Sequence, residues 1–265
     1  MAFYGYEFLF DNVSSSIFGL FISDLESSGV INSPMGSSVT PSTKKILRNP
    51  IEYIYSVEQG PVLEFDLSFN SATPISAYDR NLIGSVLFGQ AEYKKLQIVQ
   101  PDLQDIYFNC IITSATATYV GNLHYGWRCH IRCDSPYAYE FPKIYQRTNT
   151  SGGIWSELIN INNLSVSSDY TYPLVVFTTN GIGTSFSITN LTDANRVFAF
   201  GGISANETIS VDNHKQIIKS STGLMRISYF NLNWLRLLPG INVLNVVGGY
   251  GTYNIVYTPL KKIGG

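Results

Sequence analysis

Apolar and polar residues alternate without interruption from Trp127 to Asp134. The apolar positions are Trp127, Cys129, Ile131 and Cys133, and the polar positions are Arg128, His130, Arg132 and Asp134. Because successive residues of a strand point to opposite faces, this pattern predicts a half-buried strand.

Ser135-Pro136 follows this strand directly. Proline has no N–H to donate within a sheet, and it disfavours helical backbone in the residue before it. The chain is therefore expected to leave its sheet here. We place a domain boundary near Ser135, which divides the chain into domains 1–135 and 136–265.

The first part of the chain contains further alternating segments. Tyr4, Tyr6, Phe8 and Phe10 form one face of an N-terminal strand, and a short apolar segment follows at 17–22. Other predicted strands are 51–57, 63–69, 93–99 and 106–119. The Gln59-Gly60-Pro61 turn predicts that 51–57 and 63–69 form a hairpin. Residues 27–43 have the Ser, Gly, Thr and Pro content of a loop.

One segment changes to a helical period. Leu82, Ile83, Val86 and Leu87 recur at helical spacing, and Ser76 or Asp79 precedes them as a possible N-cap. We predict one helix over 78–88, with Gly89 as its stop signal. Gly84 inside the segment weakens it by about 1 kcal/mol relative to alanine.

The second part shows no helical pattern. Short predicted strands are 158–162, 174–179, 184–190, 197–200, 208–211, 214–219, 224–230, 234–238, 241–247 and 252–258. Many short strands separated by Gly and Asn turns predict a β-sandwich or jelly roll. Residues 211–214 and 248–251 are typical of hairpin turns, and 149–153 has the composition of an exposed loop or linker.

The fold class predicted from these patterns is mainly β. The composition has 45% hydrophobic, 14% aromatic and only 14% charged residues, against about 25% charged in a typical soluble domain. Such a surface is expected either in an assembly, where aromatic residues are enriched, or in an all-β domain, whose strands favour aromatic residues.

The formal net charge of −2 gives no bulk attraction to nucleic acid. The start of the sequence has no basic residues ahead of its apolar ones, and no apolar run approaches the roughly 18 residues of a membrane span. We expect a soluble chain without a secretory signal and without membrane insertion.

Three cysteines raise the question of a metal or redox site. Cys129 and Cys133 lie roughly 13 Å apart on one strand at ~3.3 Å per residue, beyond the about 7 Å Cα limit of a disulfide. His130 points to the opposite face, so a Cys-His-Cys metal cluster is not expected. Cys110, Cys129 and Cys133 are predicted to be buried, reduced thiols.

The sequence has no catalytic motif of the G-x-S-x-G, Walker, H-E-x-x-H or paired C-x-x-C types. His124, His130 and His214 have no ligand-like spacing and are expected at the surface or in an interface. Glu64 and Asp66 share one strand face, where solvated acids are the usual finding. We therefore expect no enzyme activity, no catalytic residues, no metal and no cofactor.

Arg128, His130 and Arg132 are candidate interface residues. On the polar face of their strand they could line the edge of a neighbouring copy and pair with its acids. A solvated basic strand face explains the same three residues equally well.

Four segments, taken in order, resemble the distal tail protein (Dit) family of long-tailed, siphovirus-type bacteriophages. They are the N-terminal strand with Ile17-Phe18-Gly19-Leu20, the passage DRNLIGSVLFGQAEYKKLQI, the strand end from Cys133 to Tyr139, and the stretch from Trp234 to Asn242. The resemblance covers nearly the whole chain. One departure is the tryptophan expected near Val86-Leu87, which is missing.

This resemblance implies an N-terminal belt domain with one helix (α+β) that assembles into a homohexameric ring, and an all-β galectin-like sandwich after it. Such rings join the tail tube protein and the tape-measure protein to tail-tip and receptor-binding proteins, and DNA only passes through their channel. The implied location is the distal end of the virion's tail, after synthesis in the host cytoplasm.

Two other functions remain open from the residues alone. Galectin-like sandwiches often bind sugars, and Trp155 or Trp234 could stack on a sugar ring, which makes a carbohydrate-binding module for host-surface recognition the alternative. A glycan hydrolase is the third possibility.

Overall fold

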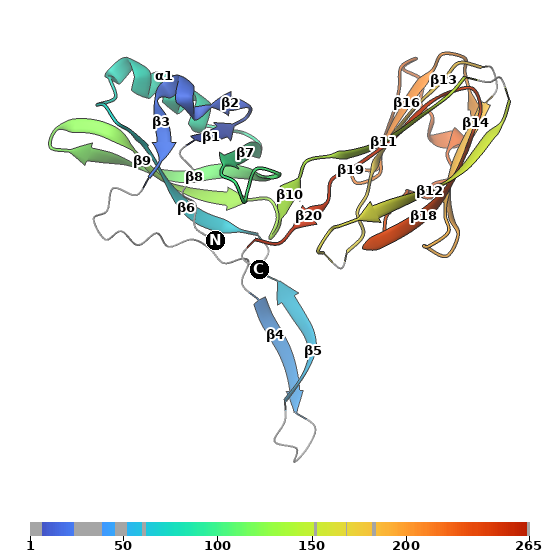
Figure 1. Cartoon of the computed structure of the whole chain (residues 1–265), viewed down its shortest axis with the longest axis horizontal. Helices are drawn as coiled ribbons and strands as arrows, with labels where there is room; N and C mark the ends of the chain where they lie inside the picture. Colours follow the sequence, from blue (N-terminus) through green and yellow to red (C-terminus); the bar gives the residue numbers. More distant parts are fainter. Residues whose placement is uncertain are drawn as a thin grey trace. The chain divides into compact units, whose positions relative to one another are not determined.

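The computed structural model describes residues 7–23, 39–45, 52–59, 62–150, 153–167, 169–181 and 184–263. The chain divides into two compact units, one comprising Met1–Glu140 with Lys261–Gly265 and the other Phe141–Leu260. Strands dominate both units, and the single α-helix among the described residues lies in the first (Figure 1). The predicted mainly β fold class is confirmed.

The first unit is built on one large antiparallel sheet with the strand order β2-β1-β7-β8-β9-β6-β3, to which β10 and β20 also pair. Its strands are β1 (Glu7–Phe10), β2 (Val13–Ser14), β3 (Leu20–Ile22), β6 (Glu64–Ser71), β7 (Lys94–Val99), β8 (Ile106–Val120), β9 (Leu123–Cys133), β10 (Ala138–Glu140) and β20 (Leu260–Lys261). A 3-10 turn, η1 (Ser15–Phe18), connects β2 to β3.

The predicted helix is present as α1 (Ala77–Leu87). Ser76 is its N-cap, and the Ser76 side chain accepts a hydrogen bond from the Asp79 N–H. Gly89, just beyond the helix, has a φ of +76°, which glycine adopts without the steric cost of a side chain. Ile83 and Leu87 are the buried residues of α1.

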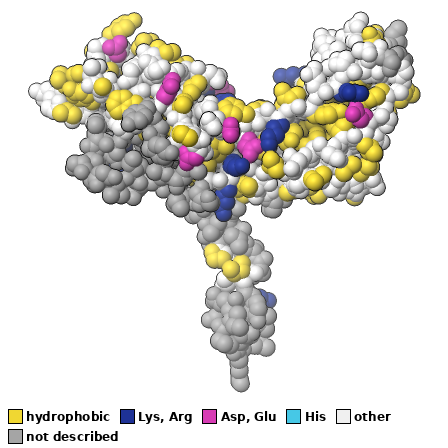
Figure 2. All heavy atoms as spheres, viewed as in Figure 1, with side chains coloured by type: hydrophobic (Ala, Val, Ile, Leu, Met, Phe, Trp, Pro, Cys, Tyr) yellow, Lys and Arg dark blue, Asp and Glu magenta, His cyan; other side chains and the backbone are white. Residues whose placement is uncertain are grey.

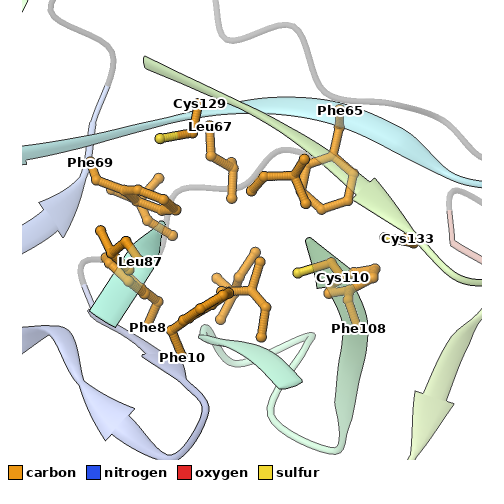
Figure 3. Packing of buried hydrophobic residues seen from close by; sticks show 14 of the residues in the cluster. Phe8, Phe10, Phe65, Leu67, Phe69, Leu87, Phe108, Cys110, Cys129 and Cys133 are labelled. Carbon is orange, nitrogen blue, oxygen red and sulfur yellow. The ribbon is translucent and has the colours of Figure 1, made fainter. Parts of the chain in front are cut away.

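The core of the first unit lies inside a rolled sheet. Phe8 on β1 stacks on Phe69 of β6 with ring centroids 4.3 Å apart, although β7, β8 and β9 separate these two strands in the sheet order. Figure 3 shows Phe8, Phe10 and Leu87 facing Phe69 and Leu67 across this core. The aromatic face predicted for the N-terminal strand is confirmed at Phe8 and Phe10, and its other two members, Tyr4 and Tyr6, lie outside the described residues.

The hairpin predicted for 51–57 and 63–69 is wrong. β5 (Glu52–Gln59) pairs with β4 (Val39–Lys45) in a separate two-stranded sheet, whereas β6 pairs with β9 and β3. The predicted loop 27–43 therefore ends in a strand from Val39 onward. Local turn residues did not reveal this because the partner of β6 lies far along the chain.

The second unit is a sandwich of two antiparallel sheets (Figure 1). The five-stranded sheet has the order β11-β19-β13-β16-β17 and the four-stranded sheet has the order β12-β18-β14-β15. Their strands are β11 (Lys143–Asn149), β12 (Trp155–Asn163), β13 (Leu174–Thr179), β14 (Thr184–Asn190), β15 (Arg196–Ile203), β16 (Thr208–Asp212), β17 (Ile217–Ser220), β18 (Gly240–Gly248) and β19 (Gly251–Tyr257). Buried residues from both sheets, among them Phe177, Phe186 and Tyr253, form one core.

Three predictions in this unit need correction. Residues 224–230 form no strand but carry the 3-10 turn η2 (Ile227–Tyr229), and 234–238 contributes only an isolated bridge at Leu237. The turn 248–251 joins β18 and β19, which belong to different sheets, so it is a crossover and not a hairpin. The turn 211–214 does connect a hairpin, β16–β17.

Asn149, placed at the start of the predicted linker 149–153, is buried at the end of β11. Its Nδ2 donates hydrogen bonds to the carbonyl oxygens of Gly153 and Gly249. This part of the predicted linker is therefore held inside the sandwich unit.

The two units differ at both ends from the predicted division into 1–135 and 136–265. After Pro136 the chain forms β10, where Tyr139 lies opposite Tyr107 of β8. At the other end, Ile263 packs into the core of the first unit. These contacts assign 136–140 and the C-terminal residues to the first unit.

No helix in the described part of the chain combines the length and the apolar character needed to cross a membrane.

Candidate functional site

The candidate interface residues lie on the solvent face of β9, where they meet two acids of β6. The register places Arg132 opposite Glu64 and His130 opposite Asp66. We call Glu64, Asp66, Arg128, His130 and Arg132 the charged face. Strand alternation explains its composition, because Cys129, Ile131 and Cys133 between these residues are buried.

Ion pairs connect the charged face within a single chain. His130 Nδ1 lies 2.7 Å from Asp66 Oδ1, and Arg132 Nη1 lies 3.4 Å from Glu64 Oε1. Arg128 Nη2 lies 3.6 Å from Asp66 Oδ2. The five side chains are 42–53% exposed, so each pair stabilises the fold by only about 0–1 kcal/mol.

The acids of the same sheet thus already neutralise these bases. Two arginines face two carboxylates, so these four charges cancel within the chain. The sequence identified the three bases but not their partners, because the β6–β9 pairing spans a long stretch of chain. Glu64 and Asp66, expected to be merely solvated, are members of this face.

Next to the charged face, aromatic and polar side chains hold β10 against β8. Tyr139 stacks on Tyr107 with ring centroids 5.5 Å apart, and the Tyr139 hydroxyl donates to Asp134 Oδ1 at 3.0 Å. Burial raises the pKa of Asp134, and burial followed by the Asp134 charge raises the pKa of Tyr139. Lys95 Nζ lies 4.3 Å from the Tyr107 ring centroid. This cluster fixes the path by which the chain leaves β9.

β8 extends well beyond its pairing with β7. β7 pairs with β8 only at Phe108–Cys110, and in the described part of the chain no strand pairs with that edge of β8 beyond Cys110. We call residues 111–120 the open edge of β8. At the tip of the hairpin, Tyr119, Val120 and Leu123 are each more than half exposed.

The alternation of hydrogen bonds along β9 indicates which backbone groups of β8 point into the open edge. The Cys133 N–H donates to the carbonyl oxygen of Leu63, the residue before β6, and the Asp134 N–H donates to the carbonyl oxygen of Asn109 on β8. Even-numbered residues of β9 therefore bond to β8, and odd-numbered ones bond to β6. Ala115 lies opposite Cys129, so its N–H and C=O point away from β9 and into the open edge.

His124 was expected at the surface or in an interface, but it is buried within the chain. His124 is 3% exposed, with the Trp127 and Tyr119 rings 4.5 and 5.2 Å from its own ring centroid. Within the part of the chain that the structure describes, neither ring nitrogen has a hydrogen-bond partner by distance and angle. Burial, followed by the charge of Arg80, lowers the pKa of His124. Gly and Asn near it predicted a turn, and nothing in the local sequence indicated that the side chain turns inward.

Cys110, Cys129 and Cys133 are buried free thiols, as predicted. Burial raises the pKa of Cys129 to about 12. Within the described residues, no group of three or more His, Cys, Asp or Glu side chains is placed to hold a metal ion.

Both tryptophans considered for sugar stacking pack against the sandwich core. Trp155 stacks on Tyr253 with centroids 5.7 Å apart, and Trp234 meets Phe230 edge-on at 4.9 Å. Each ring therefore makes an aromatic contact within the protein, and this arrangement does not favour a carbohydrate site built on them.

Comparison with known proteins identifies the family. Residues 3–135 match a family model described as a phage tail protein N-terminal domain, and residues 137–257 match one described as a phage tail C-terminal domain. A search of curated proteins finds no match.

Among solved structures, the chain is similar to the crystal structure of the Dit protein of phage SPP1. The TM-score is 0.65 at 12% sequence identity, and the match covers 96% of this chain and 98% of that one. SPP1 Dit is described as a paradigm of the hub adsorption apparatus in phages that infect Gram-positive bacteria. A match to the structure of infectious bursal disease virus has a TM-score of only 0.20, which is too low to indicate a shared fold. The chain therefore belongs to the phage tail proteins, and it has the fold of a distal tail protein.

Proposed function

We propose that this chain is the structural hub at the distal end of a phage tail, where six copies form a ring around a channel for DNA. The ring joins the tail tube protein and the tape-measure protein to the tail-tip and receptor-binding proteins. Its role is mechanical, without enzymatic chemistry.

The observation that carries this proposal is the similarity to SPP1 Dit, which extends over nearly the full length of both chains. Both units take part in that similarity, so it concerns the whole two-unit chain and not one domain alone. The low charge content supports an assembled protein as well. Figure 2 shows few charged side chains among many hydrophobic and uncharged ones on the viewed surface.

The sheet of the first unit supplies a means of joining copies head to tail. Besides the open edge of β8, β6 has an open edge on the side away from β9. β3 pairs with β6 only at Phe69–Ser71, so among the described residues the outward backbone groups of Glu64 and Asp66 meet no further strand. The two open edges lie on opposite sides of the three-stranded segment β8-β9-β6.

Open strand edges readily accept another strand. In our proposal the β8 edge of one copy pairs with the β6 edge of the next. Such a contact uses two different surfaces, and it closes into a ring when its rotation divides a full turn. Arg128, His130 and Arg132 remain interface candidates, because the charged face lies between the two edges.

Ala115→Pro tests this contact. Proline removes the N–H that Ala115 directs into the open edge, while leaving the β8–β9 hydrogen bonds intact. Ala115→Ser is the matched control, because it changes the side chain and keeps the N–H.

We expect light scattering to give the mass of six chains for the unmodified protein and for Ala115→Ser. Ala115→Pro should give single folded chains. A monomeric unmodified protein at tens of micromolar, or an Ala115→Pro variant that assembles normally, would contradict the proposed ring contact.

A further inference from the structure

Two of the three cysteines lie directly opposite each other in the sheet. The register of β8 and β9 pairs Cys110 with Cys133, and both side chains are buried, at 0% and 1% exposure, on the core face. In Figure 3 both cysteines lie on the same side of the core. Cys129 has no such partner, since its neighbours across the two adjacent strands are Ala115 and Leu67.

The Cys110–Cys133 pair occupies a non-hydrogen-bonded position of the ladder. The Asp134 N–H donates to the Asn109 carbonyl, so the neighbouring residue pair makes no hydrogen bonds to each other. The Cys133 N–H supports this assignment, because it donates to Leu63 on the opposite side. At such positions the two Cα atoms are about 4.5 Å apart and the side chains are closest.

That spacing falls within the about 4.4–6.8 Å Cα range of protein disulfides. The two residues also point to the same face, so no change of strand register is needed to join them. Cys129, four residues from Cys133 on the same strand, cannot compete for the bond.

We propose that Cys110 and Cys133 are a site of oxidative modification, at which a cross-strand disulfide forms by exchange with a small-molecule disulfide. One thiolate attacks a sulfur of the small disulfide, which forms a mixed disulfide and releases one small thiolate. The second cysteine then attacks the protein-bound sulfur and releases the other. Two protein thiols are oxidised, one small disulfide is reduced to two thiols, and the two thiol protons pass to the leaving thiolates.

Reactivity determines when this exchange occurs. Burial and the nearby Asp134 carboxylate raise the pKa of Cys133 to about 12, and burial with the neighbouring Cys133 raises the pKa of Cys110. Thiolate is therefore scarce in the closed sheet, and exchange is slow there. It proceeds during folding or when β8 and β9 separate locally, and the closed sheet then protects the bond from reduction. The disulfide would lock β9 to β8 beside the point where the chain passes from β9 to β10.

The test is refolding of the full chain from denaturant in a buffer of oxidised and reduced glutathione. Free thiols are then counted under denaturing conditions, and disulfide-linked peptides are identified by mass. We expect the count to fall from three to one, with a single peptide pair linking Cys110 to Cys133. The oxidised protein should unfold at a temperature several degrees higher, roughly as a cross-link of this loop length predicts.

Three variants separate this site from general oxidation. Cys129→Ala should still lose two thiols, whereas Cys110→Ala and Cys133→Ala should lose none. Retention of all three thiols in refolded protein would overturn the proposal. So would a bond to Cys129, or glutathione adducts that never resolve into the internal disulfide. Peptide mapping of the unmodified chain distinguishes these outcomes even when a variant fails to fold.

Discussion

At the scale of single residues, Glu207 and Arg226 form a fully buried ion pair in the sandwich. Arg226 Nη2 lies 2.6 Å from Glu207 Oε2 and Arg226 Nε lies 2.7 Å from Oε1. The pair fixes residues 221–230 beside β16 and β17. We expect Arg226→Met to destabilise the sandwich by about 3 kcal/mol, because it leaves a buried carboxylate unpaired.

Chemical denaturation measures this loss. Arg147→Met is the matched control, since the Arg147–Glu157 pair is 50% and 35% exposed and is worth less than about 1 kcal/mol. Equal losses in the two variants would contradict the importance of the buried pair.

The same ion pair predicts that the stability of the sandwich depends on pH. Burial alone would raise the pKa of Glu207, but hydrogen bonds from Arg226, Ser220 and the Ser204 backbone lower it from 4.5 to about 2. A depressed carboxyl pKa stabilises the fold above the unfolded value, and this contribution disappears as the pH falls from about 4.5 toward 2. Glu207→Gln should remove this part of the stability–pH profile, measured by urea unfolding. A profile unchanged in that window would contradict the assignment.

His124 predicts a second pH effect in the first unit. Its pKa is lowered below the ordinary 6.5, so the unfolded chain binds a proton that the folded chain rejects. Stability is therefore complete above about pH 6.5 and declines as the pH drops below it. His124→Phe should abolish this decline and fit between Trp127 and Tyr119 without unsatisfied nitrogens. The test is the unfolding midpoint of the variant as the pH is lowered. A midpoint that falls as steeply as in the unmodified protein would refute this prediction.

At the scale of elements, two glycines predict opposite outcomes. A Cβ on Gly84 of α1 would meet only Phe88 Cδ2 at 3.8 Å, whereas a Cβ on Gly126 of β9 would lie 2.1 Å from the Phe69 carbonyl oxygen. Gly84→Ala should stabilise the chain by about 0.5–1 kcal/mol through helix propensity. Gly126→Ala should destabilise it by about 2 kcal/mol or more, because β6 must move. Thermal unfolding compares the two, and effects of the same sign would contradict the structure.

Elements with a strong local signal were predictable from the sequence. The period and the Ser76 cap gave α1 to within one residue at each end, and strict alternation gave the buried and exposed faces of β9. Strand partners were not predictable in this way. The pairing of β5 with β4, and of β6 with β9, depends on contacts between distant segments that no turn residue encodes.

Side-chain hydrogen bonds explain why one predicted strand is absent. Residues 224–230 alternate as a strand would, but the buried Arg226 and the hydrogen bonds of Asn231 to the Val197 and Ala199 backbone hold this segment as a loop. The candidate interface residues were recognisable because strand alternation put Arg128, His130 and Arg132 together. The acids beside them and the open edge of β8 became visible only with the sheet pairing.

At the scale of the whole molecule, the order of the units explains how one chain can serve as a hub. Among the described residues, the rolled sheet has two open strand edges, and the sandwich has its own core and sheets. In the proposed ring, the contacts between copies come from the first unit, and the sandwich is available for other contacts. The proposed ring is closed around a channel. It differs from other assemblies of six chains in its geometry and not in its mass.

Electron microscopy of the purified full chain tests for the closed ring most directly. We predict class averages of rings with six-fold symmetry and an open centre, each with six sandwich units attached, and the loss of these rings in Ala115→Pro. Single bilobed particles, two-fold dimers or open filaments from the unmodified chain would contradict it.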